Sequence, residues 1–185
     1  MTQLRNFGSC TCCGDLLAGR FNRRHVLRGA GGLAAFAALQ PFTALAATGH
    51  YEAMVLGCID PRMQVPVVAY TAGRDLTGKY SQFVIAGAAI AVVAEPFKDW
   101  HKAFWDNLAT SVELHKIKSV IAINHRECGA AEIAYGKDKV TPRAVETETH
   151  RAALAEFRKQ VGQRQPKLKV ETALMDINGT IEMIG

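Results

Sequence analysis

The sequence has few aromatic residues, and most of it has neither strong charge nor clustered cysteines. Aromatic residues make up 8% of the 185 residues, although hydrophobic residues as a whole make up 49%. This length and apolar content favour one ordinary globular domain. After residue 47 no run of lysine and arginine interleaved with aromatic residues occurs. The sequence therefore lacks the features of a nucleic-acid-binding surface, and we expect no nucleic-acid partner.

Positive charge is concentrated at the N-terminus. The net charge is +5, and residues 1–46 supply 5 − 1 = +4 of it through five arginines and one aspartate, which leaves +1 for the rest of the chain. Arg23 and Arg24 form an adjacent pair and precede an uncharged Gly/Ala-rich run over residues 29–39. That run is too short to cross a membrane as a helix. Small residues follow at 44–46.

This order of basic pair, modest apolar run and small residues resembles a twin-arginine export signal. We expect cleavage after Ala46 or Ala47. Residues 1–47 would then be a removed signal, residues 48–185 the mature domain, and the protein periplasmic or otherwise exported by the twin-arginine machinery. The alternative is a buried alanine-rich helix, which the three glycines within residues 29–32 disfavour.

Removal of the signal would also remove three of the five cysteines. These are Cys10, Cys12 and Cys13. The mature chain keeps only Cys58 and Cys128. In an oxidising compartment these two thiols could form a disulfide, and the competing interpretation is that both bind a metal ion.

Short apolar runs alternate with helical patterns in the mature domain. We predict strands over Ala53–Gly57, 82–85, Ser119–Ile123 and Leu168–Met175, and a hairpin turn at Asn178-Gly179. The alternation indicates an α/β fold with a mainly parallel central sheet, helices on its faces and a closing β-hairpin at the edge.

Caps and apolar spacing predict the helices. Asp106 is placed to cap one helix, and Thr141 is placed to cap a long helix that begins at Pro142. The predicted apolar positions of the long helix are Val145, Ala153, Phe157 and Val161. This spacing puts His150 on the polar face of that helix. Two further histidines, His101 and His115, are expected on helix surfaces, with a proton-shuttle role for His101 as the alternative.

Two motifs carry the chemistry, and each follows an apolar run. The first is Cys58-Ile59-Asp60-Pro61-Arg62 and the second is His125-Arg126-Glu127-Cys128. The carboxyl ends of parallel strands lie at one edge of a sheet, so the motifs can meet there. Two thiolates and one imidazole suit zinc and leave one tetrahedral position open for water. Zinc can lower the pKa of that water to about 7, which makes hydroxide available as a nucleophile.

Asp60 and Arg62 complete the predicted catalytic group. They stand two positions apart, so the guanidinium can hold the carboxylate through charge-assisted hydrogen bonds. Held in this way, Asp60 can accept a hydrogen bond from the zinc-bound oxygen. Released from Arg62, it could become a zinc ligand itself. The sequence leaves both states open.

The pattern Cys-x-Asp-x-Arg followed by His-x-x-Cys-Gly resembles the β-class carbonic anhydrases, and the resemblance covers essentially all of residues 52–185. It implies one zinc ion per chain held by Cys58, His125 and Cys128, with the Asp60–Arg62 dyad beside it. It also implies reversible hydration of CO₂ to bicarbonate, and a homodimer or higher homo-oligomer.

Three features depart from the family pattern. Pro61 replaces the usual serine, the turn at residues 86–89 reads Ala-Gly-Ala-Ala without its usual polar side chains, and cleavage near Ala46 would leave no N-terminal helical arm. The apolar turn keeps open a second function, hydrolysis of carbonyl sulfide or carbon disulfide at the same zinc site. Pro61 and the short N-terminus keep open a third, a catalytically silent zinc-binding protein.

Overall fold

A five-stranded sheet forms the centre of the computed structural model, which describes residues 49–185. The predicted export signal and its cleavage site lie outside the described residues. The strands are β1 (Ala53–Gly57), β2 (Tyr80–Val84), β3 (Ser119–His125), β4 (Lys169–Met175) and β5 (Ile181–Met183). Their spatial order is β2-β1-β3-β4-β5. All neighbouring pairs are parallel except the closing β4–β5 hairpin, which confirms the predicted α/β fold.

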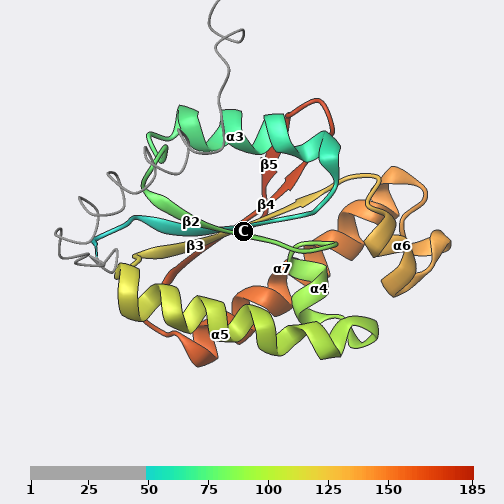
Figure 1. Cartoon of the computed structure of the whole chain (residues 1–185). Helices are drawn as coiled ribbons and strands as arrows, with labels where there is room; N and C mark the ends of the chain where they lie inside the picture. The colour runs from blue at the N-terminus through green and yellow to red at the C-terminus, as the bar shows by residue number, and fades with distance from the viewer. Residues whose placement is uncertain (1–48) are drawn as a thin grey trace, which may run out of the picture. The chain divides into compact units, whose positions relative to one another are not determined.

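Helices cover both faces of the sheet (Figure 1). They are α3 (Gln64–Gly73), α4 (Ala89–Val93), α5 (Lys98–His115), α6 (Gly129–Tyr135) and α7 (Arg143–Arg164), with short 3₁₀ turns at Pro61–Met63, Glu95–Phe97 and Lys137–Lys139. In Figure 1, α3 lies over one face, while α4, α5 and α7 lie over the other. None of the helices in the described part of the chain is long and apolar enough to cross a membrane.

The core has two layers because neighbouring side chains of a strand point to opposite faces. Met54 and Leu56 of β1 belong to the layer that contains Phe104 of α5 and Phe157 of α7. The intervening Ala53 and Val55 belong to the layer that contains Met63 and Val67 beside α3. β1 and β3 are almost fully buried. The two motif-bearing strands are therefore the most enclosed part of the sheet.

The two predicted helix starts are wrong. α5 begins at Lys98, so Asp106 lies inside the helix, where it pairs with Lys102 one turn earlier. Such i,i+4 ion pairs are typical of a helix interior. α7 begins at Arg143, with Pro142 as a cap residue that has no side-chain hydrogen bond. Thr141 is therefore one position too early to act as the cap.

The prediction for His150 is also wrong, because its side chain is 0% exposed. The inward face of α7 carries Glu146, His150, Ala153, Leu154, Phe157 and Val161. Val145, assigned to that face from the sequence, is 37% exposed. The predicted apolar positions Ala153, Phe157 and Val161 are confirmed as buried. The inward positions follow the helical repeat of about 3.6 residues, but the first two of them are polar, so a search for apolar spacing chose Val145 in place of Glu146. His101 and His115 are half-buried, so neither lies fully on a helix surface.

Candidate metal centre

The carboxyl ends of β1 and β3 bring the two sequence motifs together. Cys58 follows β1 directly, His125 is the last residue of β3, and Cys128 immediately precedes α6. One ligand atom from each of these three residues lies within 4.8 Å of the other two. The cysteines are free thiols in this structure, so the alternative disulfide is not formed. The three side chains could hold a metal ion.

The imidazole of His125 is oriented as a metal ligand requires. Its Nδ1–H donates to the backbone carbonyl of Arg126 at 2.8 Å, which leaves a lone pair on Nε2. Nε2 is buried and has no hydrogen-bond partner among residues 49–185. Buried polar atoms in native proteins nearly always have a partner, so this unpartnered nitrogen fits a metal ion that completes its bonding.

The two sulfur atoms differ in their readiness to ionise. A hydrogen bond from Cys128 is the main reason that the pKa of Cys58 falls to about 4, and a smaller contribution comes from the backbone N–H of Gly87, 3.2 Å from Cys58 Sγ. The same sulfur–sulfur interaction raises the pKa of Cys128, and burial raises it further. Burial alone would lower the pKa of His125, but its interaction with Cys58 raises it above the usual value. Cys58 is thus the group that readily supplies a thiolate.

Asp60 and Arg62 form the predicted pair. Arg62 Nη2 donates to Asp60 Oδ2 at 2.7 Å, and the backbone N–H of Arg62 donates to Asp60 Oδ1 at 2.9 Å. These hydrogen bonds lower the pKa of Asp60 to about 2, so it is ionised at neutral pH. Asp60 Oδ2 lies 4.0 Å from His125 Nε2 and points toward the three-ligand group without belonging to it. A role for Asp60 as a metal ligand stays a prediction.

Arg62 also joins the two motifs. Its Nη2 donates to the backbone carbonyl of Glu127 at 3.2 Å, and its Nη1 donates to Glu127 Oε2 at 3.1 Å. Glu127 stands between the ligands His125 and Cys128. One guanidinium therefore contacts the carboxylate of the first motif and the backbone of the second.

Glu146 of α7 is a site residue that the sequence did not reveal. Its Oε1 accepts a hydrogen bond from the backbone N–H of Glu127 at 2.6 Å, and its Oε2 accepts one from Arg126 Nη1 at 3.2 Å. Glu127 has a φ of +57°, a conformation that non-glycine residues seldom adopt. The buried carboxylate thus holds the backbone between His125 and Cys128 in an unfavourable conformation. Thr147, next along α7, accepts a second bond from Arg126 Nη1 at 3.0 Å.

Two hollows flank the ligands. One of about 270 Å³ lies beside Cys58 and is lined by Gly57, Cys58, Ile59, Met63, Gln64, Val67, Gln82 and Val84. The other, of about 380 Å³, lies beside Cys128 and is more polar, with Arg126, Glu127, Glu132, Arg143 and Glu146 among its lining residues. Each of the two cysteines therefore borders a hollow large enough for a small molecule.

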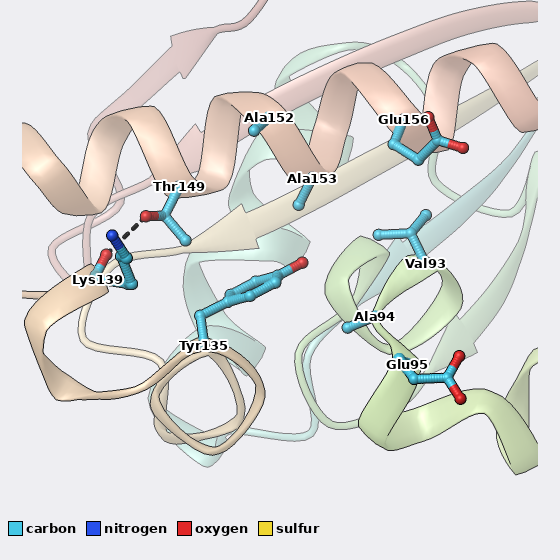
Figure 2. Close-up of a pocket in the computed structure, with 9 residues that line it drawn as sticks. All are labelled: Val93, Ala94, Glu95, Tyr135, Lys139, Thr149, Ala152, Ala153 and Glu156. Atoms are coloured by element: carbon cyan, nitrogen blue, oxygen red, sulfur yellow. Dashed lines mark hydrogen bonds between the residues drawn. The ribbon is translucent and has the colours of Figure 1, made fainter.

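A third cavity, of about 470 Å³, is lined by none of the three ligands. Figure 2 shows the Tyr135 hydroxyl pointing into it, between Val93 and Ala94 on one side and Ala153 of α7 on the other. Burial raises the pKa of Tyr135. Glu156 at the rim already accepts hydrogen bonds from Lys159 and Gln160. Its carboxylate is therefore engaged by neighbours on its own helix.

Comparison with known proteins identifies a family. The model of a family described as "Putative carbonic anhydrase" matches residues 48–185. An uncharacterised protein of Rickettsia bellii (strain RML369-C) is 31% identical over 131 residues, which are 71% of this chain and 80% of that protein. A second uncharacterised protein, from Rickettsia conorii, is 30% identical over 131 residues, which are 71% of this chain and 70% of that protein.

Solved structures show the same fold at low sequence identity. A Coccomyxa β-carbonic anhydrase in complex with acetazolamide has a TM-score of 0.51 and 14% identity, with 89% of this chain and 86% of that chain covered. The β-carbonic anhydrase CcaA has a TM-score of 0.52 and 12% identity, with 86% and 94% covered. These likenesses show the fold that the sequence resemblance implied.

Proposed function

This chain belongs to that carbonic anhydrase family, and from this premise we propose that it is a zinc-dependent carbonic anhydrase that interconverts CO₂ and bicarbonate. One observation carries the proposal: the ligand atoms of Cys58, His125 and Cys128 converge within 4.8 Å, with the ionised Asp60 carboxylate 4.0 Å from His125. Sulfur and nitrogen donors in this combination favour zinc over Mg²⁺ or Ca²⁺, which prefer oxygen.

A zinc ion at these three residues supplies a Lewis acid with one open coordination position, which makes water nucleophilic near neutral pH. The chain's own groups do the rest of the work. The hydrogen bond from Nδ1 to the Arg126 carbonyl fixes the His125 ring, so that Nε2 is the nitrogen available to bind the metal. Asp60 stays ionised because Arg62 donates to both of its carboxylate oxygens. Its Oδ2 is the atom that accepts a hydrogen bond from the reacting water and so orients an oxygen lone pair toward the carbon of CO₂.

The hollow beside Cys58 suits the substrate. Its volume of about 270 Å³ exceeds what a triatomic molecule needs, and Ile59, Met63, Val67 and Val84 make part of its lining apolar. An apolar lining admits CO₂ without competing hydrogen bonds. Carbonyl sulfide and carbon disulfide are larger than CO₂, and the same volume and partly apolar lining can admit them, which makes them the second candidate substrates.

Export and self-association belong to the same proposal. The twin-arginine pattern around Arg23 and Arg24 supports export, and the family match begins at residue 48, directly after the segment that we expect to be removed. We infer a periplasmic or otherwise exported protein that forms a homodimer or higher homo-oligomer.

The test is an assay of the exported, zinc-loaded protein on CO₂, carbonyl sulfide and carbon disulfide, with metal analysis of the same sample. We expect one zinc per chain and CO₂ hydration as the fastest reaction. If carbonyl sulfide or carbon disulfide were turned over faster than CO₂, that molecule would become the proposed substrate. Zinc without activity on any of the three would favour a silent zinc-binding protein, and a metal-free sample with Cys58 joined to Cys128 would refute the proposal.

Asp60→Asn separates the catalytic role from ligation. If Asp60 acts through the reacting water, zinc content stays near one per chain while turnover falls by about 10- to 100-fold. If zinc content falls as well, Asp60 is a zinc ligand in the resting protein. Asp106→Asn is the matched control, because Asp106 is an exposed carboxylate that only pairs with Lys102 within α5.

A further inference from the structure

The turn between β2 and α4 is strained next to the metal ligands. Ala88 has φ +49° and ψ −117°, and the N–H of Ile90 donates to the carbonyl of Gly87 at 3.0 Å. These values describe a type II′ turn in which Ala88 occupies the position that favours glycine. Strain of this kind persists only where the surroundings impose it. Some neighbouring group must therefore hold the turn in place.

The acceptors of the Gly87 and Ala89 peptide N–H groups, on either side of Ala88, show what holds the turn. The N–H of Gly87 donates to Cys58 Sγ at 3.2 Å. The N–H of Ala89 donates to the side-chain oxygen of Asn124 at 3.0 Å. Asn124 is 1% exposed and directly precedes His125 in β3. The turn is thus fastened to β3 at one end and presents a hydrogen-bond donor to the Cys58 sulfur at the other.

His150 determines which way the Asn124 amide faces. Asn124 Nδ2 donates to His150 Nδ1 at 3.1 Å, so the opposite side of the amide, Oδ1, faces Ala89. The ring of His150 is 0% exposed, and its Nε2 has no hydrogen-bond partner among residues 49–185. A polar ring is buried here, and its one hydrogen bond in this part of the chain is to Asn124. Burying a nitrogen without a partner is costly, so we expect the His150 ring to serve a purpose in the interior. The purpose that its contacts indicate is to orient the Asn124 amide.

We propose that Asn124 and His150 are positioning residues of the metal centre, which hold the 87–90 turn so that the Gly87 N–H donates to the Cys58 sulfur. A hydrogen bond to a metal-bound thiolate draws electron density from sulfur and tunes both ligand orientation and the acidity of the metal. The inference rests on the proposed function, because the effect needs a metal at Cys58. Neither residue contacts substrate, so both act through the turn.

The test uses the cobalt(II)-substituted protein, in which the thiolate-to-cobalt charge-transfer band reports on hydrogen bonding to sulfur. In Asn124→Leu we expect the band to move to longer wavelength, because the thiolate becomes a better donor without the Gly87 N–H. We also expect the zinc affinity or kcat to fall by about 10- to 100-fold. A band at the wild-type position with full metal content would overturn the inference.

His150 offers a second pair of variants should Asn124→Leu not fold. In His150→Asn, the amide oxygen stands as many bonds from Cα as Nδ1 does, so it can accept from Asn124, and we expect a band close to wild type. In His150→Leu the acceptor is lost, and we expect the band to shift as in Asn124→Leu. Equal bands in these two variants would refute the positioning role.

Val161→Ala controls for general loss of stability, because Val161 is 0% exposed and lies on the same helix as His150, about three turns further along it. We expect its cobalt band to be unchanged even where its melting temperature falls. The failure of the proposed function would look different: wild-type protein would then show no thiolate-to-cobalt band at all, which would overturn both proposals. A normal wild-type band with an unshifted Asn124→Leu band would overturn only the inference drawn here.

Discussion

The two ligand-bearing loops are supported in opposite ways. The loop after β1 is held by groups at the surface: the side chain of Arg62 is 45% exposed, and that of its partner Glu127 is 64% exposed. The loop after β3 is held from the interior, where the side chains of Arg126 and Glu146 are each 7% exposed. Both supports include an arginine–carboxylate pair. They differ in how much water surrounds the pair.

The difference assigns a task to each loop. A buried ion pair is costly to break because the remaining charge is left without water, so the Arg126–Glu146 side fixes the spacing between His125 and Cys128. An exposed pair contributes little to stability and can reorganise at low cost. The Asp60–Arg62 side therefore suits a carboxylate that must meet a changing substrate. In this comparison, one loop supplies rigidity and the other supplies reactivity.

The largest expected effect comes from breaking the buried support. Glu146→Leu leaves the Arg126 guanidinium and the Glu127 N–H without their closest acceptor, which should lower the free energy of unfolding by about 3 to 5 kcal/mol. The low end applies if the carboxylates of Asp176 and Glu182 retain part of the pairing with Arg126. Their oxygens lie 3.5 Å from Arg126 Nε and 3.6 Å from Arg126 Nη2, respectively. Urea unfolding and zinc content measure the outcome, and we expect both to fall.

Two variants delimit this prediction. Glu146→Gln keeps an oxygen for the Glu127 N–H and loses only the charge, so its loss of stability should be the smaller of the two. Glu148→Leu alters an exposed carboxylate two positions along α7, with 72% of its side chain accessible, and should change little. Glu146→Leu as stable as wild type would show that the second loop is not held from the interior.

The reactive half of the site was readable from the sequence because its residues are close together in the chain. Cys58 and Asp60 follow one apolar run, His125 and Cys128 follow another, and the parallel sheet then brings the runs to one edge. The strands, the hairpin and the convergence of the three ligands were predicted for this reason. The export signal falls outside the described residues and stays a prediction.

The supporting half could not be read in the same way. Glu146 and His150 are polar residues on the inward face of α7, and a search for apolar spacing assigns polar residues to the solvent side. Their role depends on contacts with Glu127 and Asn124, which the sequence does not pair with them. The one available signal was Asn124, a polar residue at the end of an otherwise apolar strand.

The next largest effect is a loss of stability in acid, which we expect because His150 is buried on the interior side of the site. Burial is the main reason that the pKa of His150 falls to about 4, and the nearby positive charge of Arg126 contributes. In the unfolded chain His150 has a pKa near 6.5, so the unfolded state binds a proton that the native state refuses. This contribution of His150 to the free energy of unfolding is fully present above pH 6.5. It is lost as the pH falls toward 4, and the total loss is up to about 3 kcal/mol.

His150→Asn isolates this contribution, because asparagine does not titrate. Urea unfolding of wild type and variant between pH 7 and pH 4.5 should show a steeper fall for wild type, although the variant can be the less stable of the two at pH 7. The expected difference in slope is at most about 1.4 kcal/mol per pH unit. Parallel curves would mean that His150 is not held neutral in the interior.

The smallest effect on stability, but a clear one on turnover, should come from the exposed support. Arg62→Gln removes the donor that lowers the pKa of Asp60 to about 2, so this pKa should rise toward 3.8. The Asp60–Arg62 contribution to stability is present above about pH 4 and lost as the pH falls toward 2, so the variant should match wild type most closely in acid. At pH 7 Asp60 remains ionised but is held only by the backbone N–H of residue 62, so we expect CO₂ hydration to fall by about tenfold with zinc content unchanged. Glu127→Gln, which leaves the Asp60 contacts intact, should keep most of the activity. If Arg62→Gln lost zinc as readily as Glu146→Leu, the two loops would share one structural task, and the division between a rigid and a reactive side would not hold.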